Sequence, residues 1–187
     1  MRLFIAINLP RAVRRAMVDS TAPLREAAPR LSWVTEDRLH LTMEFLGDQP
    51  DDSLPLLRDA VIGATTGHAP VALALRGLGA FPNLRAPRIV WMGVEPDPKL
   101  ELLQHDLARA CEALGYERDA RTFRPHITLG RARTPVRAET ARSLAAAARA
   151  IAWSATVEAT NVDVMESRLL PSGAQYVVAA SIPLRGG

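Results

Sequence analysis

Apolar residues along the chain follow two different spacings. In eight segments they alternate with polar residues or form short unbroken runs, and both patterns are typical of β-strands. The segments predicted to be extended are residues 2–10, 32–35, 38–47, 71–79, 88–94, 123–131, 155–170 and 174–184. The last two are predicted to pair as a hairpin through the short turn between them.

Four other segments carry apolar residues at the three- and four-residue spacing of an amphipathic helix. The clearest of them places Leu100, Leu103 and Leu107 on one stripe. Helices that alternate with strands, with no low-complexity linker between them, predict an α+β fold in one body. The segments predicted to be helical are residues 10–20, 52–67, 97–116 and 138–151.

Two of the four histidines stand two residues before a threonine within an apolar run. These motifs are His40-Leu41-Thr42-Met43 and His126-Ile127-Thr128-Leu129. Because side chains alternate along a strand, the histidine and threonine of each motif share one face. With eleven threonines in the chain, two such coincidences among four histidines are expected by chance about 2% of the time. The pair therefore favours a functional site over two hydrogen-bonded His and Thr pairs of purely structural importance.

The two motifs lie 86 residues apart, which is close to half the length of the chain. Each half supplies an early strand, a helix, the strand with the motif, and a further helix and strand. We therefore expect residues 1–187 to form a single bilobal domain with an internal duplication, one HxTx motif per lobe. The two lobes are expected to face each other.

The composition narrows the class of protein. Of 187 residues, 48% are hydrophobic and 23% charged, as in folded globular proteins. No apolar run approaches the ~20 residues of a membrane span, and the first apolar segment is too short for a secretory signal. The single cysteine, Cys111, rules out an internal disulfide and fits a reducing cytoplasm.

The net charge of +3 is carried almost wholly by arginine, because Lys99 is the only lysine. Arginine offers planar, bidentate donors that suit phosphate. An arginine-rich coding bias would give the same composition. The charge therefore permits a nucleic-acid or nucleotide partner without demonstrating one.

Metal chemistry is not expected. Zinc requires three or four histidine, cysteine or carboxylate ligands at recurring spacings, and the chain has neither His-x-His nor HExxH. Two facing imidazoles instead suit an in-line displacement at phosphorus, in which one takes a proton from the nucleophile and the other gives one to the leaving oxygen. The hydroxyls of Thr42 and Thr128 can donate to the non-bridging oxygens. The residues alone do not assign the two roles to the two histidines.

Arg131 and Phe45 each stand five residues after a motif histidine. Arg131 can bind a phosphate through two nitrogens, but strict alternation puts it on the face opposite His126. Only a strand end or a bulge at Gly130 would bring it round. Phe45 likewise alternates onto the core face, which favours core packing over a role in base stacking.

Other polar and aromatic residues receive simpler interpretations. Glu44 alternates onto the face of His40 and is expected at the rim of the site. Trp33, Trp91 and Tyr176 are expected to be core or sheet-face aromatics. The remaining histidines, His68 and His105, are expected to be solvated.

With these motifs, the chain resembles the two-histidine phosphoesterase superfamily. Within it, the sequence is most similar to the bacterial and archaeal RNA 2′,3′-cyclic phosphodiesterases, historically called 2′-5′ RNA ligases. The resemblance implies two pseudo-symmetric antiparallel sheets that line a central cleft, with helices packed outside. It is carried by residues 2–10, 40–47, 88–94, 123–131 and 172–184.

The resemblance also implies roles for single residues. His126 would be the proton acceptor for the attacking water, and His40 the proton donor to the departing 3′ oxygen, which leaves a 2′-phosphate. Thr42, Thr128 and Arg131 would contact the phosphate or ribose, and Phe45 matches an aromatic position suited to a base. No metal or cofactor is implied. The partners would be RNA ends or nucleotides that carry a 2′,3′-cyclic phosphate, and we expect a cytoplasmic monomer.

Three alternatives remain open at this point. The same site could act as a 2′-5′ RNA ligase, because a 5′-hydroxyl needs the same acid and base as water. It could serve as a phosphodiesterase for another cyclic phosphate. A module that only binds RNA ends would tolerate substitution of both His40 and His126.

Overall fold

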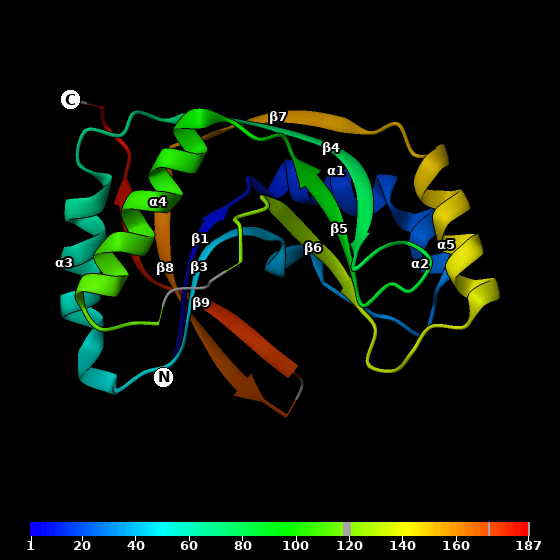
Figure 1. Cartoon of the computed structure of the whole chain (residues 1–187), viewed down its shortest axis with the longest axis horizontal. Coiled ribbons are helices and arrows are strands. Elements are labelled where there is room, and N and C mark those ends of the chain that lie inside the picture. Colours follow the sequence, from blue (N-terminus) through cyan, green and yellow to red (C-terminus); the bar gives the residue numbers. More distant parts are fainter. Residues whose placement is uncertain (118–120, 172, 187) are drawn as a thin grey trace.

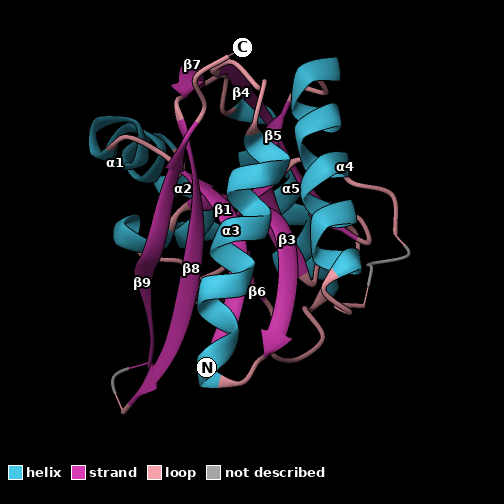
Figure 2. Ribbon diagram, turned by 90° about the vertical axis from the view of Figure 1, so that its left-hand side faces the viewer, coloured by secondary structure: helices cyan, strands magenta, loops and turns pink. Residues whose placement is uncertain are grey.

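A computed structural model describes residues 1–117, 121–171 and 173–186. Within these ranges nine strands form one sheet in the order β7-β4-β5-β6-β3-β1-β8-β9, and β2 pairs with β6 beside this path. Helices α3 and α4 lie together over one end of the sheet, while α1, α2 and α5 gather at the other (Figure 1). Figure 2 shows α3 and α4 in front of the strands that they cover. The predicted α+β class, with helices outside, is confirmed.

Most predicted elements are present with shifted ends. The short helix α2 was not predicted, and residues 38 and 39 precede the strand that was predicted to begin there. The helices are α1 (Arg11–Ser20), α2 (Ala22–Ala27), α3 (Leu54–Thr65), α4 (Pro98–Ala113) and α5 (Ala138–Ala150). The strands are β1 (Arg2–Asn8), β2 (Ser32–Trp33), β3 (His40–Asp48), β4 (Val71–Phe81), β5 (Ile89–Val94), β6 (His126–Arg131), β7 (Ser154–Ala159), β8 (Asn161–Leu170) and β9 (Gly173–Pro183).

The sheet has two halves with β3 and β6 at their junction. One half is β3-β1-β8-β9 and the other is β6-β5-β4-β7, and every neighbouring pair is antiparallel. The halves meet through one registered pair, Leu41 with Ile127. The two expected sheets are therefore two halves of one curled sheet, and the motif strands are the two that meet.

The extended segment predicted over residues 155–170 divides at Thr160. Strand β7 pairs with β4, with Val71 opposite Ala159, whereas β8 pairs with β1 and β9. The two strands therefore lie in opposite halves of the sheet. The buried apolar positions shift by one residue here, from Val157 and Ala159 in β7 to Val162 and Val164 in β8. This break in alternation marks the change of partner.

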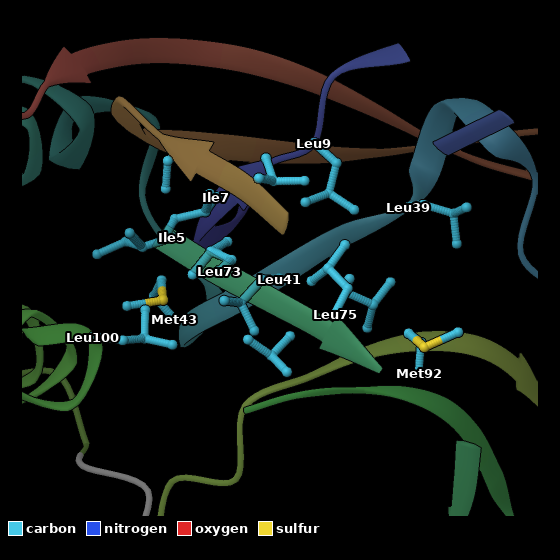
Figure 3. Close-up of a cluster of buried hydrophobic side chains, with 14 of the residues drawn as sticks. Ile5, Ile7, Leu9, Leu39, Leu41, Met43, Leu73, Leu75, Met92 and Leu100 are labelled. Carbon is cyan, nitrogen blue, oxygen red and sulfur yellow. The ribbon is translucent and has the colours of Figure 1, made fainter. Parts of the chain in front are cut away.

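Apolar side chains on the helix-covered face of the sheet form one buried cluster that includes residues of both halves. Leu41 and Met43 of β3 lie in it beside Ile5 and Ile7 of β1, and Leu100 of α4 closes one side (Figure 3). Burying a side chain of this size contributes about 1.5–3 kcal/mol. The core thus fixes both motif strands from behind, and their other face carries the histidines and threonines. We call that face the site face.

None of the helices in the described part of the chain has the length and apolar character needed to cross a membrane.

Candidate active site

Both motif histidines are the first residue of their strand, and both are held in the same way. The Nδ1–H of His40 donates to the carbonyl of Arg38 over 2.7 Å, and that of His126 donates to the carbonyl of Arg124 over 2.6 Å. A carbonyl only accepts, so Nδ1 carries the proton in each ring. Each Nε2 is then the atom left for chemistry.

The hydrogen bond partners of these rings point to a signal that the sequence analysis did not use. An arginine stands two residues before each histidine, so the repeated pattern is Arg-x-His-x-Thr in both halves. The carbonyl of that residue fixes the tautomer and orientation of the imidazole. In β3 the Nε2 of His40 also lies 3.1 Å from the Thr42 hydroxyl, which can donate to it.

The two histidines share one site. Leu41 pairs with Ile127 in antiparallel register, so His40 and His126 flank the junction on the same face of neighbouring strands. A positive charge on His126 lowers the pKa of His40. The Arg131 guanidinium lowers the pKa of both.

Burial is the largest influence on both imidazoles. It lowers the pKa of His40 and of His126 below the usual histidine value, because a charged ring loses hydration. The carbonyls of Arg38 and Arg124 oppose this shift, and the Arg131 charge adds to it. At neutral pH both rings are therefore uncharged, with the proton on Nδ1 and a lone pair on Nε2.

A β-bulge in β3 reverses the expected positions of Glu44 and Phe45. Ile5 pairs with Glu44 and Ala6 with Thr42, which leaves Met43 without a partner. Residues after the bulge change faces. Phe45 therefore lies on the face of His40 and Thr42 with 59% of its surface exposed, and the prediction that it packs in the core is wrong.

Glu44 moves the other way. It is buried on the helix side, where the side-chain amide of Gln104 donates to its carboxylate over 3.1 Å. The expectation of a carboxylate at the rim of the site is thus wrong for the same reason. The bulge was not visible in the sequence because no glycine marks it.

Strand β6 contains an equivalent bulge at Leu129. Val90 pairs with Gly130 and Trp91 with Thr128, so Leu129 has no partner and Arg131 turns onto the face of His126. This is the bulge that a phosphate-binding role for Arg131 required. Gly130 itself is enclosed, because a Cβ there would lie 2.7 Å from the ring of Trp33.

Aromatic rings surround each imidazole. Phe4 and Tyr176 lie 5.0 Å and 5.4 Å from the His40 ring, between centroids. Phe81 meets His126 edge-on at 5.0 Å, and Trp91 lies at 6.4 Å. Trp91 and Tyr176 are sheet-face residues, as predicted, but they form the walls of the site. Nothing local in the sequence indicates this, since they come from β5 and β9.

Two pockets include residues of the motif strands. One of about 180 Å³ is lined by Phe81, Trp91, Arg124, Pro125 and His126. The other, of about 390 Å³, is lined by Phe45, Leu46, Gly47, Gln49, Gly115, Tyr116 and Glu117. Each pocket therefore lies beside a different motif strand.

The other titratable candidates lie outside the site. His105 is exposed on α4, as predicted, whereas His68 is largely buried and its Nε2 lies 2.9 Å from the Asp106 carboxylate. Cys111 is buried, and burial together with the charge of Glu44 raises its pKa to about 12, which makes it an unreactive thiol. Among the residues that the structure describes, no three His, Cys, Asp or Glu gather as metal ligands.

Comparisons with known proteins agree with this arrangement. The family model of the 2′-5′ RNA ligase superfamily matches residues 10–167. An RNA 2′,3′-cyclic phosphodiesterase of Thermus thermophilus is 33% identical over all of this chain and 91% of its own length. One of Geobacillus stearothermophilus is 34% identical over 98% of this chain, which spans 57% of the length of that relative.

The fold is also similar to a solved structure. The crystal structure of the protein TT0787 of Thermus thermophilus superimposes with a TM-score of 0.81 and 29% identity. The match covers 100% of this chain and 99% of the other.

Proposed function

We propose, from the premise that the chain belongs to the 2′-5′ RNA ligase superfamily, that it is an RNA 2′,3′-cyclic phosphodiesterase. It hydrolyses the cyclic phosphate at an RNA end to a 2′-phosphate by acid–base catalysis, without a metal. The observation that carries the proposal is the matched pair of imidazoles, each with Nδ1 fixed by a carbonyl and Nε2 available to one phosphoryl group.

The reaction needs one base and one acid on opposite sides of phosphorus. Nε2 of His126 takes a proton from water while the water oxygen bonds to phosphorus. The bond from phosphorus to the 3′ oxygen breaks, and the Nε2–H of a protonated His40 supplies the proton to that oxygen. The products are a 2′-phosphate and a 3′-hydroxyl.

The low pKa of His40 in the free protein fits this role once the substrate is bound. The cyclic phosphate carries a negative charge, which favours protonation of a nearby imidazole. His126, whose Nδ1 bond is the more exposed of the two, stays the base at the side open to water. Each role contributes about 10²- to 10⁴-fold to the rate.

The remaining residues of the site face bind the substrate. Thr42 and Thr128 donate to the non-bridging oxygens, and Arg131 neutralises their charge. Phe45 offers an exposed ring beside the larger pocket, where it stacks on the base of the terminal nucleotide. The partners are therefore RNA ends or nucleotides that bear the cyclic phosphate. We further propose that the two halves arose by duplication and that the protein is a cytoplasmic monomer. No cofactor takes part in the reaction.

The test is an activity assay in chelator with a 2′,3′-cyclic mononucleotide and identification of the product. Wild-type protein and the His105→Ala control should release the 2′-phosphate at equal rates, because His105 is exposed on α4. His40→Ala and His126→Ala should each lose about 10²-fold or more. A 3′-phosphate product, or no product with a folded protein, would refute the proposal.

A second candidate function is the joining of RNA ends through a 2′-5′ link. One observation favours it, namely the pocket beside His126, on the side where the nucleophile enters.

A further inference from the structure

We propose that the pocket lined by Phe81, Trp91, Arg124, Pro125 and His126 binds the first nucleoside of an RNA whose 5′-hydroxyl attacks the cyclic phosphate. We call it the acceptor pocket. The inference rests on the proposed function and its assignment of His126 as the base. It adds a binding site for a second substrate. This site recognises the first base of the acceptor RNA and the phosphodiester on the 3′ side of that nucleoside.

In-line displacement places the acceptor pocket on the nucleophile side. The attacking and leaving oxygens stand on opposite sides of phosphorus. The leaving 3′ oxygen is at His40, so the ribose and base of the cyclic nucleotide lie toward β3 and the pocket at Phe45. Hydrolysis brings only a water molecule to the His126 side and leaves the pocket there unused.

The walls of the acceptor pocket suit a nucleobase. Phe81 stands edge-on to His126 with centroids 5.0 Å apart, and Trp91 is tilted by 41° to Phe81 at 5.3 Å. Trp91 is fixed, because its ring occupies the place of a Cβ at Gly79, only 2.4 Å from where that atom would be. At about 180 Å³ the pocket is smaller than the ~300–1,000 Å³ typical of drug-sized ligands. It therefore fits one base rather than two.

The environment of His40 is different. Phe4 and Tyr176 enclose that ring, and its Nε2 already has the Thr42 hydroxyl as a partner. His126, in contrast, is itself part of the lining of the acceptor pocket. A nucleoside seated on Phe81 and Trp91 thus delivers its 5′-hydroxyl to the imidazole that serves as the base.

Arg124 gives the acceptor pocket a charged edge. Its carbonyl holds His126, while its side chain is exposed and lines the pocket. An acceptor longer than one nucleoside carries a phosphodiester at its 3′ side. The Arg124 guanidinium can pair with that group, so a dinucleotide should be a better acceptor than a nucleoside.

The transfer step balances without ATP. The 5′ oxygen bonds to phosphorus and its proton passes to Nε2 of His126. The bond to the 3′ oxygen breaks, and His40 supplies the proton to that oxygen. The product is a 2′-5′ phosphodiester with a free 3′-hydroxyl.

The experiment measures the ratio of transfer to hydrolysis for a 2′,3′-cyclic mononucleotide in chelator. The acceptors are methanol, adenosine and the dinucleoside monophosphate ApA, each at rising concentration. We expect the ratio to saturate with adenosine and with ApA, at an about tenfold lower concentration for ApA, and to rise linearly with methanol. A linear rise with all three acceptors would overturn the inference while hydrolysis continued. Absence of hydrolysis as well would instead refute the proposed function.

Substitutions of the residues that line the pocket test whether the acceptor binds there. Phe81→Ala should reduce the transfer ratio for ApA by about tenfold or more, and Phe81→Leu, which keeps an apolar side chain without a ring face, should reduce it similarly. Arg124→Gln should abolish the advantage of ApA over adenosine, whereas the charge-matched control Arg133→Gln, at an exposed arginine after β6, should retain it. An unchanged ratio, with a raised KM for the cyclic nucleotide instead, would mean that the pocket holds the donor base and would overturn the inference.

Discussion

Phe45 and Arg131 occupy equivalent positions in the two halves of the sheet. Each stands five residues after its motif histidine and reaches the site face through a bulge two residues before it, at Met43 or Leu129. One position is aromatic and the other cationic. A site built from two matching strands is thus asymmetric at this pair, with a stacking surface on the His40 side and a phosphate ligand on the His126 side.

Phe45 is predicted to contribute to binding and not to folding. Phe45→Ala should lower kcat/KM for a cyclic nucleotide. The decrease should correspond to a loss of about 1–3 kcal/mol in binding free energy, which is the contribution of one stacked base. Because the side chain is 59% exposed, the free energy of unfolding should change by only about 0.5 kcal/mol. Steady-state kinetics and urea denaturation measure the two quantities. Ile62→Ala, at an exposed apolar residue of α3, is the control. Equal kinetics for the two variants would contradict the assignment.

Arg131 is predicted to set the pH range of the enzyme. Its charge lowers the pKa of both His40 and His126, so Arg131→Gln should raise both. The profile of kcat/KM against pH reports the pKa values of the free enzyme, and both of its limbs should move to higher pH. The maximum should also fall, since a phosphate ligand is lost.

Arg133→Gln is the matched comparison, because it removes the same charge from an exposed position two residues further on. Its profile should keep the wild-type limbs. If the limbs of Arg131→Gln also stayed in place, Arg131 would lie too far from the imidazoles to act on them.

Gly130 is predicted to be essential for the packing of β6 against Trp33 of β2. Gly130→Ala places a methyl group 2.7 Å from Trp33, whose Nε1–H donates to the carbonyl of Ala28 over 3.0 Å and resists displacement. We expect a loss of about 1–3 kcal/mol in stability, as for overpacking, and a reduced kcat/KM because Arg131 is adjacent.

Gly63→Ala provides the contrast in α3, where a new Cβ meets nothing within 4 Å. It should stabilise the protein by about 0.5–1 kcal/mol through helix propensity. Thermal or denaturant unfolding of the two variants would reveal the difference, and equal stabilities would show that the contact with Trp33 is relieved at no cost.

Much of the site could be predicted because its information is local. The spacing of His40 to Thr42 and of His126 to Thr128 depends only on alternation along a strand. The requirement for a bulge near Gly130 also followed from counting residues to Arg131. The matching bulge at Met43 did not, because its cause is the pairing with β1 and the burial of Glu44 against Gln104.

The features that the sequence could not reveal depend on contacts between distant segments. Tyr176 and Phe4 approach His40 from strands at opposite ends of the chain, and no pattern of spacing connects them. The new partners taken up after Thr160, β1 and β9 in place of β4, likewise depend on distant segments. Two local signals were present and unused. One is the arginine two residues before each histidine, and the other is the break in apolar alternation at Thr160 and Asn161.

The most direct test of the central claim is a double-mutant cycle on kcat/KM for a 2′,3′-cyclic nucleotide, with His40→Ala, His126→Ala and the double variant. If both imidazoles act on one phosphoryl group, kcat/KM of the double variant should be about as low as that of the less active single variant. Removing either histidine already abolishes the paired acid–base catalysis, so removing the second has little further effect. Losses that multiply, or a single variant with wild-type activity, would contradict the account.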